Sequence, residues 1–360
     1  MCTRKKITPC LMLLFLFGFM SIFAGTATAD ALRDEMVARA KKEKPMVVGG
    51  SSGDLYRGQL SNFNKQYPFV SIQPFIANTA DTVNRVVAEG QAGKASMDLV
   101  AVSSDGLELL AKAGLLQKME FPHLKDFYPG MQPSHGAFVQ AFLHTRSQGV
   151  YNTDLVKPDE IPKSWEEMLD PKWNGRTMVS RSMEEVPAQL AFIWGKDGQL
   201  NWDRSFDFFT KLMEQKPIIA NGFRDGNNRL AAGETSILWF SAIGPPARLH
   251  FLGAPVGLIA FPKFPGIFRS FGIVKGAQSP ASAWLLIDYL TSPQGQFDYT
   301  DKVSAQLPIN QKAKPGKLAQ WVMSQNGRIE HAVPLSAENV FDEKVTKKSE
   351  DFFLKLLGIK

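Results

Sequence analysis

Small hydroxyl and amide side chains follow three successive apolar segments, each of which is predicted to be a β-strand. These side chains belong to Ser51, Ser52, Asn78, Thr79, Ser103 and Ser104. In an open parallel sheet the carboxyl ends of the strands meet at one edge, and ligands bind there. Two of the loops lead into predicted helices, whose first N–H groups have no partner inside the helix. Each residue could also serve only as a helix cap or turn residue. Taken together, the three loops predict a ligand-binding edge.

A second set of candidate residues lies farther along the chain. It comprises Arg181, Ser182, Arg224, Asn227, Trp239 and Ser241. A guanidinium group suits carboxylate or phosphate because it donates hydrogen bonds in a planar fork. Arg181 could equally form a surface ion pair, Asp225 could neutralise Arg224, and a tryptophan in a strand is more often part of the core. Asp105 and Glu184 could bind ligand hydroxyls or cap helices. The set predicts a small anionic solute.

The residues used for covalent or metal chemistry are scarce. Cys2 and Cys10 are the only cysteines, and both lie near the start of the chain. The five histidines show no spacing of the H-x-x-x-H kind that binds metal on a helix. We therefore expect a binding protein with no cofactor and no metal, rather than an enzyme.

Residues 1–29 are predicted to be an export signal. Arg4, Lys5 and Lys6 precede an apolar run, and Ala-Thr-Ala at 27–29 is a small-residue cleavage site. The apolar run is too short to span a membrane comfortably. Removing this segment lowers the formal net charge from +6 to +3. We expect a periplasmic protein, and the absence of a basic stripe with interleaved aromatics argues against nucleic acid as a partner.

The remaining chain alternates between strand and helix patterns. Apolar runs at 46–50, 70–77 and 96–105 predict strands, and the amphipathic segments between them predict helices. This alternation predicts an α/β protein in which helices cover both faces of a mostly parallel sheet.

The segment 151–176 has the most specific pattern. Asn152 and Asp154 are typical turn residues, Ser164 is predicted to cap a short helix, and Pro171 ends that helix. The residues whose order and spacing stand out are Tyr151, Asn152, Pro162, Ser164, Trp165, Glu167, Met168, Pro171, Trp173 and Gly175. This order closely resembles the start of the second lobe in iron-type solute-binding proteins of ABC importers.

The resemblance covers most of the chain after the export signal. It implies a type 2 periplasmic-binding fold with two lobes, each a mixed, mostly parallel sheet flanked by helices, and two hinge crossings. The implied divisions are the signal 1–29, a first lobe of 30–140 and 272–315, and a second lobe of 141–271 and 316–360. Such a protein is expected to be a monomer that closes on a solute and presents it to a membrane permease.

The sequence departs from the iron-binding branch of this family at the metal ligands. That branch has two adjacent tyrosines where this chain has Trp239, Phe240 and Ser241, and none of its six tyrosines are adjacent. Iron binding is therefore not carried over, and the resemblance to members that bind organic or phosphorylated anions fits better. Ferric binding by other ligands, a sensor role beside a signalling receptor, and an enzyme that uses the same cleft remain as alternatives.

Overall fold

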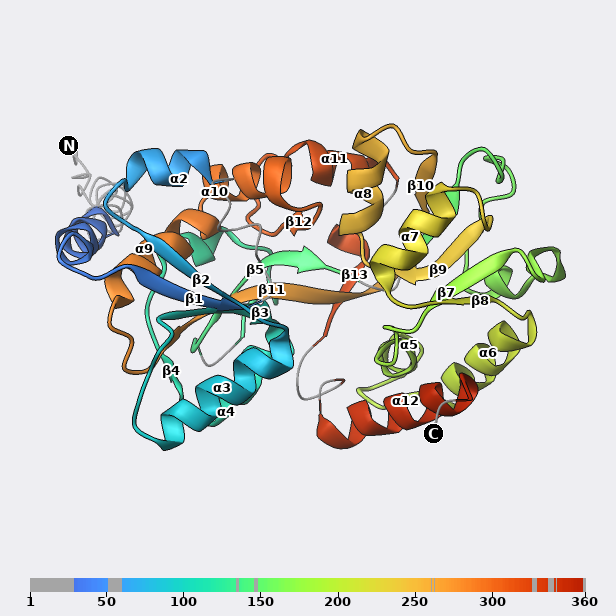
Figure 1. The fold of residues 1–360 in the computed structure, drawn as a ribbon, viewed down its shortest axis with the longest axis horizontal. Coiled ribbons are helices and arrows are strands. Elements are labelled where there is room, and N and C mark those ends of the chain that lie inside the picture. The colour runs from blue at the N-terminus through green and yellow to red at the C-terminus, as the bar shows by residue number, and fades with distance from the viewer. Residues whose placement is uncertain are drawn as a thin grey trace, which may run out of the picture.

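The computed structural model consists of two α/β lobes that lie side by side and meet near the middle of the molecule (Figure 1). It describes residues 29–50, 60–133, 136–145, 148–259, 261, 263–325, 329–335, 340 and 342–358. The segment 1–28 and two candidate site residues, Ser51 and Ser52, lie outside the described residues. No helix within the described ranges is both long enough and apolar enough to cross a lipid bilayer.

The first lobe is built on a mixed sheet with the main strand order β12-β5-β11-β3-β1-β2. Its strands are β1 (Met46–Gly50), β2 (Ile72–Ile76), β3 (Leu99–Ser103), β4 (Leu116–Gln117), β5 (Val139–His144), β11 (Phe264–Val274), β12 (Leu307–Pro308) and β13 (Ala332–Pro334). The strands β2, β1 and β3 are parallel neighbours, while β11 runs antiparallel to β3 and β5.

Helices cover both faces of this sheet. The helices of the lobe are α2 (Ser61–Gln66), α3 (Thr79–Gln91), α4 (Ser104–Lys112), η2 (Pro122–Asp126), α9 (Pro280–Thr291), α10 (Pro293–Asp298) and η5 (Tyr299–Val303). Successive residues of β3 point to opposite faces. Leu99 and Ala101 pack on the side of α9, whereas Val100 and Val102 pack on the side of α3 and α4. The uninterrupted apolar run of β3 thus serves two cores at once.

The second lobe repeats this plan on a sheet with the order β10-β6-β9-β7-β8. Its strands are β6 (Gln148–Asn152), β7 (Thr177–Ser180), β8 (Ile218–Ala220), β9 (Ile237–Ser241) and β10 (Val256–Ile259). Its helices are η3 (Glu166–Leu169), η4 (Pro171–Trp173), α5 (Val186–Ile193), α6 (Trp202–Glu214), α7 (Phe223–Ala231) and α8 (Gly244–Phe251). The strands β9, β7 and β8 are parallel, and β6 is antiparallel to β9 and β10. The predicted two-lobed α/β fold is confirmed.

The C-terminal region belongs to both lobes. Helix α11 (Lys317–Ser324) packs against η5 and α8, the short turn η6 (Ile329–His331) follows it, and β13 pairs with β11 of the first sheet. Helix α12 (Glu343–Leu356) then lies on α5 and α6 of the second lobe. The expected boundary after residue 140 falls inside β5, all of which pairs in the first sheet.

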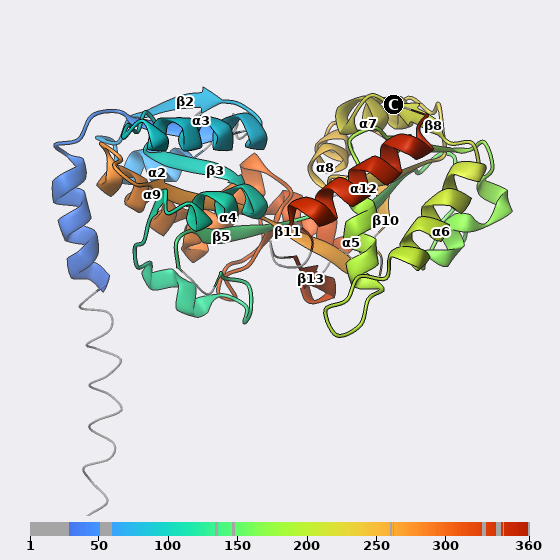
Figure 2. The same ribbon diagram turned by 90° about the horizontal axis from the view of Figure 1, so that it is seen from below.

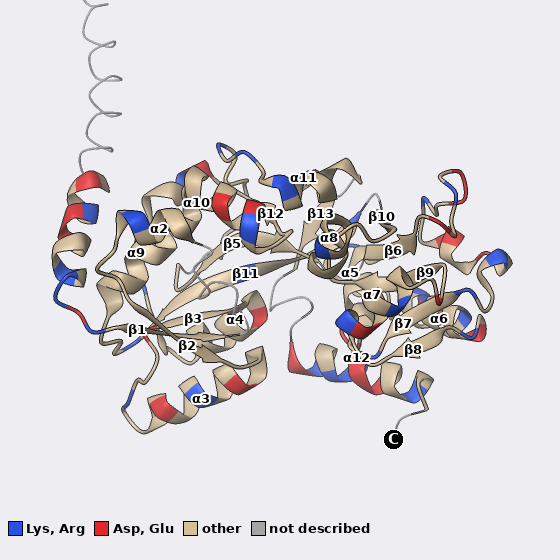
Figure 3. Ribbon diagram, turned by 45° about the horizontal axis from the view of Figure 1, so that its top comes forward, with Lys and Arg blue, Asp and Glu red and all other residues tan. Residues whose placement is uncertain are grey.

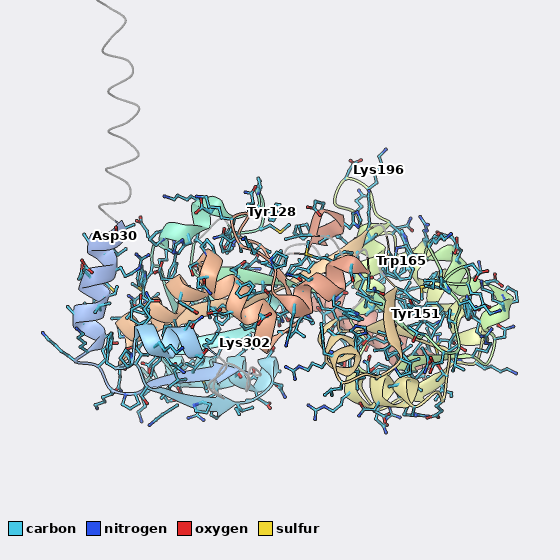
Figure 4. The ribbon with its side chains drawn as sticks, turned by 90° about the horizontal axis from the view of Figure 1, so that it is seen from above. Asp30, Tyr128, Tyr151, Trp165, Lys196 and Lys302 are labelled. Carbon is cyan, nitrogen blue, oxygen red and sulfur yellow. The ribbon has the colours of Figure 1, made fainter. Side chains whose placement is uncertain are left out.

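The segment 151–176 is a packing unit of the second lobe, where Figure 4 places Tyr151 and Trp165. The Tyr151 ring lies over Gly257, where an added Cβ would come within 2.3 Å of the ring. The Asn152 side chain accepts a hydrogen bond from the main-chain N–H of Asp154, as the turn prediction requires. Trp165 stacks on Phe261 with ring centroids 3.9 Å apart. The pattern therefore identifies the fold rather than the site.

The short helix after Ser164 is 3-10 rather than α-helical. Ser164 Oγ does accept from the main-chain N–H of Glu167, at 3.3 Å, as a cap. The 3-10 helix ends at Leu169, because Pro171 has no N–H group with which to continue it. The segment is therefore limited to a single 3-10 turn. Gly175 then adopts the left-handed conformation, with φ 68°, and leads the chain into β7.

The buried carboxylate of Asp98 joins three segments of the first lobe. It accepts hydrogen bonds from the main-chain N–H groups of Val47, Gln278 and Ser279 at 2.8, 2.7 and 2.8 Å. One carboxylate thus fixes β1 and the start of α9 against the entry to β3, and all three hydrogen bonds are charge-assisted because their acceptor is a carboxylate.

We expect Asp98→Ala to destabilise the protein strongly, because three shielded N–H groups would lose their acceptor. At roughly 1–3 kcal/mol for each unsatisfied group, the loss is about 3 kcal/mol or more. Urea unfolding followed by circular dichroism measures it. Asp342→Ala is the control, since this exposed residue caps only the start of α12 and its loss should cost about 1 kcal/mol. Equal losses in the two variants would contradict the anchoring role of Asp98.

Candidate functional site

The predicted site residues of the first lobe divide into three roles. Asn78 is a helix cap, because its side chain accepts from the main-chain N–H of Asp81 at 2.8 Å. The hydroxyls of Thr79 and Ser103 lie 3.4 Å apart, so the ends of β2 and β3 do meet as predicted. Ser104 is buried, and its hydroxyl has no hydrogen-bond partner in the described part of the chain. Thr79 and Ser103, both partly buried, form the half-site of this lobe.

The loops after β7 and β8 form the corresponding half-site of the second lobe. The main-chain N–H of Arg181 donates to Ala220 O at 2.9 Å and so extends the pairing of these strands by one residue. The main-chain N–H of Ser182 donates to Ser180 Oγ at 3.1 Å. A Cβ on Gly222 would lie 3.6 Å from Ser182 Oγ, which shows how closely the loops pack.

Both predicted arginines keep their guanidinium groups available. Arg181 and Arg224 are exposed, and no ion pair of either is seen among the residues that the structure describes. Asp225, which could have neutralised Arg224, instead accepts from the main-chain N–H of Asn221 at 2.9 Å and lies 3.6 Å from Arg229. The second lobe thus presents two cations beside the ends of β7 and β8.

The other predicted residues of this lobe are interior. Asn227, Trp239 and Ser241 are fully buried. Asn227 Nδ2 donates to Phe223 O at 2.7 Å and to Ser241 Oγ at 2.8 Å, which ties α7 to the end of β9. Trp239 packs edge-to-face on Trp173. The candidate ligand contact at Trp239 is therefore corrected to core packing, because its side chain lies in the cluster formed with α5 and α6.

The end of β9 also holds an unusual main-chain conformation. Phe240 has φ 58°, a left-handed value that costs a non-glycine residue about 1–3 kcal/mol. Its ring is held by Trp165 and Phe209 at centroid distances of 6.1 and 5.3 Å. This local strain lies where the second sheet approaches the first lobe, and nothing in the sequence signals it.

A cavity of about 530 Å³ lies between the lobes. From the first lobe and its long strand, the lining residues are Ser103, Asp105, Leu109 and Ile267; from the second lobe and the C-terminal segment, they are Glu185, Ala188, Val340, Glu343, Thr346, Lys347 and Glu350. Such a volume suits a small organic molecule. Among the predicted site residues that the structure describes, Ser103 is the one that lines this cavity.

The charge of the lining is negative. Asp105, Glu185, Glu343 and Glu350 supply carboxylates, while Lys347 supplies the one lining ammonium among the described residues. Figure 3 shows the acidic bands on α4 and at the start of α12 on the two sides of this region. The side chain of Lys347 is exposed and its Nζ lies 3.2 Å from Asp351. The sequence prediction of an anion-binding edge missed this acidic side.

The contribution of α12 was also missed. The residues of α12 that line the cavity are spaced so that they lie on one face of the helix. The sequence of an amphipathic helix does not show which part of the fold the helix packs against, so this contribution could not be predicted. In Figure 2, α12 extends from near the C-terminus toward the junction of the lobes. Within the described ranges, no three His, Cys, Asp or Glu side chains are grouped as metal ligands would be.

Comparison with known proteins defines the class. The profile of the bacterial extracellular solute-binding protein family matches residues 59–325. The chain therefore belongs to this family of ABC-importer solute-binding proteins, and it lacks the adjacent tyrosines of the iron-binding branch.

Two curated relatives share 27% identity with the chain. One is "Iron uptake protein A1" of Synechocystis, matched over 64% of this chain and 68% of its own length. The other is the "Fe(3+)-binding periplasmic protein" of Serratia marcescens, matched over 70% and 74%.

Solved structures share the fold. Iron-bound HitA from Pseudomonas aeruginosa has a TM-score of 0.70 at 16% identity and covers 87% of this chain and 99% of its own. AfuA from Actinobacillus pleuropneumoniae, with fructose-6-phosphate bound, has a TM-score of 0.61 at 19% identity and covers 87% and 96%. At these identities the likeness establishes the two-lobed architecture.

We expect Asn227→Ala to loosen the end of β9, because Ser241 would lose its buried donor. The free energy of unfolding should fall by roughly 1–3 kcal/mol. Urea titration monitored by tryptophan fluorescence measures the change. The neighbouring Asn228 is exposed on the same helix, and Asn228→Ala should change stability by no more than about 0.5 kcal/mol. A matching loss in both variants would mean that helix α7, and not the bond to Ser241, is responsible.

Proposed function

We propose that this protein captures a small anionic organic or phosphorylated solute that also carries hydroxyl groups, and delivers it from the periplasm to the membrane permease of an ABC importer. The observation that carries the proposal is the interlobe cavity, which is large enough for such a molecule and contains Ser103 from one lobe and Glu185 from the other. Residues 1–29 would direct export and then be removed.

The anionic part of the solute is assigned to the second lobe. Arg181 and Arg224 are exposed and carry no ion pair within the described residues, so binding an anion breaks no existing ion pair there. Guanidinium groups bind phosphate or carboxylate through paired, charge-assisted hydrogen bonds. The hydroxyls of Thr79 and Ser103 would complete the site from the first lobe.

The carboxylate of Glu185, on the second-lobe side of the cavity, is assigned to the hydroxyl groups of the solute. A carboxylate only accepts hydrogen bonds, so Glu185 suits the hydroxyls of a sugar or hydroxy acid and repels a bare anion. This combination favours a hydroxylated anion over inorganic phosphate. The AfuA structure, which holds fructose-6-phosphate, shows that the same fold accommodates a molecule of this class.

The first test is native mass spectrometry of the protein purified from a periplasmic extract, followed by thermal-shift assays with the retained compound, fructose 6-phosphate, citrate and inorganic phosphate. We expect a retained organic anion that raises the melting temperature when it is added back. A protein that retains no anion and is stabilised by none of these compounds would contradict the proposal.

We expect Arg181→Gln to weaken binding of the retained compound by roughly 10- to 100-fold, which corresponds to the loss of one charge-assisted hydrogen bond. Isothermal titration calorimetry measures the affinity. Arg204→Gln is the matched control, because Arg204 is an exposed arginine of the same lobe whose guanidinium already pairs with Glu166 at 2.6 Å. An unchanged affinity in Arg181→Gln would remove this residue from the site.

A ferric ion is the second candidate solute, because hard cations prefer oxygen donors and the cavity lining is rich in carboxylates. Both curated relatives carry iron in their names. If iron were bound, the purified protein would carry a ferric adduct that a chelator removes, and ferric citrate would restore its melting temperature. Under the anion proposal, chelation leaves the melting temperature unchanged.

Binding without turnover is the third part of the proposal. The residues Gly49, Gly50, Ser51, Ser52 and Gly53 have the spacing G-x-S-x-G, which in hydrolases places a nucleophilic serine after a strand. Incubating the retained compound with the protein and recovering it intact by mass spectrometry supports a transport role. Recovery of a hydrolysed product would indicate an enzyme.

A further inference from the structure

One face of α4 is exposed to the interlobe cavity. Asp105 and Leu109 lie four positions apart, on the same side of the helix, and both line the cavity. Leu109 is 57% exposed, which is unusual for a large apolar side chain beside a cleft. The Oδ1 atom of Asp105 is shielded from solvent and has no hydrogen-bond partner in the described part of the chain. This face therefore has both an apolar and a charged group without a partner.

Helix α12 presents a matching stripe from the other side of the same cavity. Glu343, Thr346, Lys347 and Glu350 follow one another at intervals of three, one and three residues, so they form one helix face, and all four line the cavity. Helix α12 lies outside the segment 59–325 that the family profile matches.

Helix α12 is fixed to the second lobe. Ser349 is buried, its hydroxyl donates to Glu184 O at 2.7 Å, and it accepts from the main-chain N–H of Ala188 at 3.0 Å. Phe352 stacks on Phe206 with centroids 3.8 Å apart. Because α12 is anchored to α5 and α6, it cannot swing onto α4 by itself. Only a movement of the lobes toward each other brings the two faces together.

We propose that α12 is the surface on which α4 closes, so that Leu109 becomes buried against Thr346 and Asp105 pairs with Lys347. This inference rests on the proposed function, since closure is how the lobes would enclose a solute. Lys347 is available for the exchange, because its contact with Asp351 is an exposed pair between residues four positions apart, which is a weak interaction.

The remaining charges make Lys347 necessary for closure. Glu185, Glu343 and Glu350 line the same cavity, so an approaching Asp105 would meet only like charges if the ammonium were absent. The electrostatics therefore place Lys347 as the residue that converts a repulsive contact between the lobes into an attractive one.

Cysteine cross-linking tests the proposed contact without knowledge of the solute. Replacing Cys2 and Cys10 with serine leaves no other cysteine in the chain. Leu109→Cys with Thr346→Cys is the test pair, and Leu109→Cys with Lys355→Cys is the control. Lys355 lies on the same helix, nine residues or roughly 13 Å farther along. Copper phenanthroline in air is the oxidant, and loss of free thiols with a shifted monomer band on a non-reducing gel reports the disulfide.

We expect the test pair to form an intramolecular disulfide roughly tenfold faster than the control pair, because a disulfide requires Cα atoms within about 7 Å of each other. Adding Lys347→Gln to the test pair should slow the reaction, whereas Lys344→Gln should leave it unchanged. Lys344 is the matched charge change, since it is exposed on the same helix and does not line the cavity. Equal rates for the test and control pairs would overturn the inference, and equal effects of the two lysine variants would overturn the role of Lys347.

Native mass spectrometry of the same variants separates this inference from the proposed function. A protein that retains its solute but never cross-links between positions 109 and 346 closes in some other way, and the proposed function stands. A protein that cross-links at these positions but retains no solute keeps the closing surface and loses the proposed function.

Discussion

The pairing of the long strand β11 is the constraint on which both lobes depend. Its eleven residues are almost all buried, and it pairs with β3 and β5 in the first sheet while its first residues pair with β13. Because β5 and β11 pair, with Ile267 opposite His144, the end of β5 and the first half of β11 lie side by side. Ile267 of β11 also lies at the base of the cavity. One strand therefore sets the position of the first sheet, the junction of the lobes and the floor of the cleft.

Much of the fold was predictable because its signals are local. The apolar runs that became β1 and β3 are visible in the sequence itself. The order of tryptophan, proline and glycine in 151–176 reflects contacts such as that of Trp173 Nε1 with Glu167 O at 3.2 Å. What could not be predicted was how far β5 continues in the first sheet. That depends on pairing with β11, more than a hundred residues away, which no local pattern encodes.

The candidate site was predictable only in part, for the same reason. The residues at the strand ends were expected from the topology of a parallel sheet, and Thr79 does meet Ser103. Asn227 and Ser241 were candidates for binding a solute, yet Asn227 donates a hydrogen bond to Ser241 in the interior. A sequence shows that a polar side chain needs a partner but does not show whether that partner is a solute or another residue. The acidic side of the cavity depends on the docking of α12, which is set by Ser349 and the aromatic residues of α6.

The resemblance to the iron-binding branch implies a tyrosine pair near the end of β9, and this chain has none there. Phe240 at this strand end has a left-handed main chain, and its ring is packed between Trp165 and Phe209. An aromatic ring held in this way offers no donor atom to a cation. The strain is offset by packing, so the end of β9 is rigid, and the groups able to choose a solute are the neighbouring arginines and the carboxylates of the cavity. On the proposed function, selectivity therefore rests on charged side chains on both sides of the cleft, and α12 supplies two of the four carboxylates that line the cavity among the described residues.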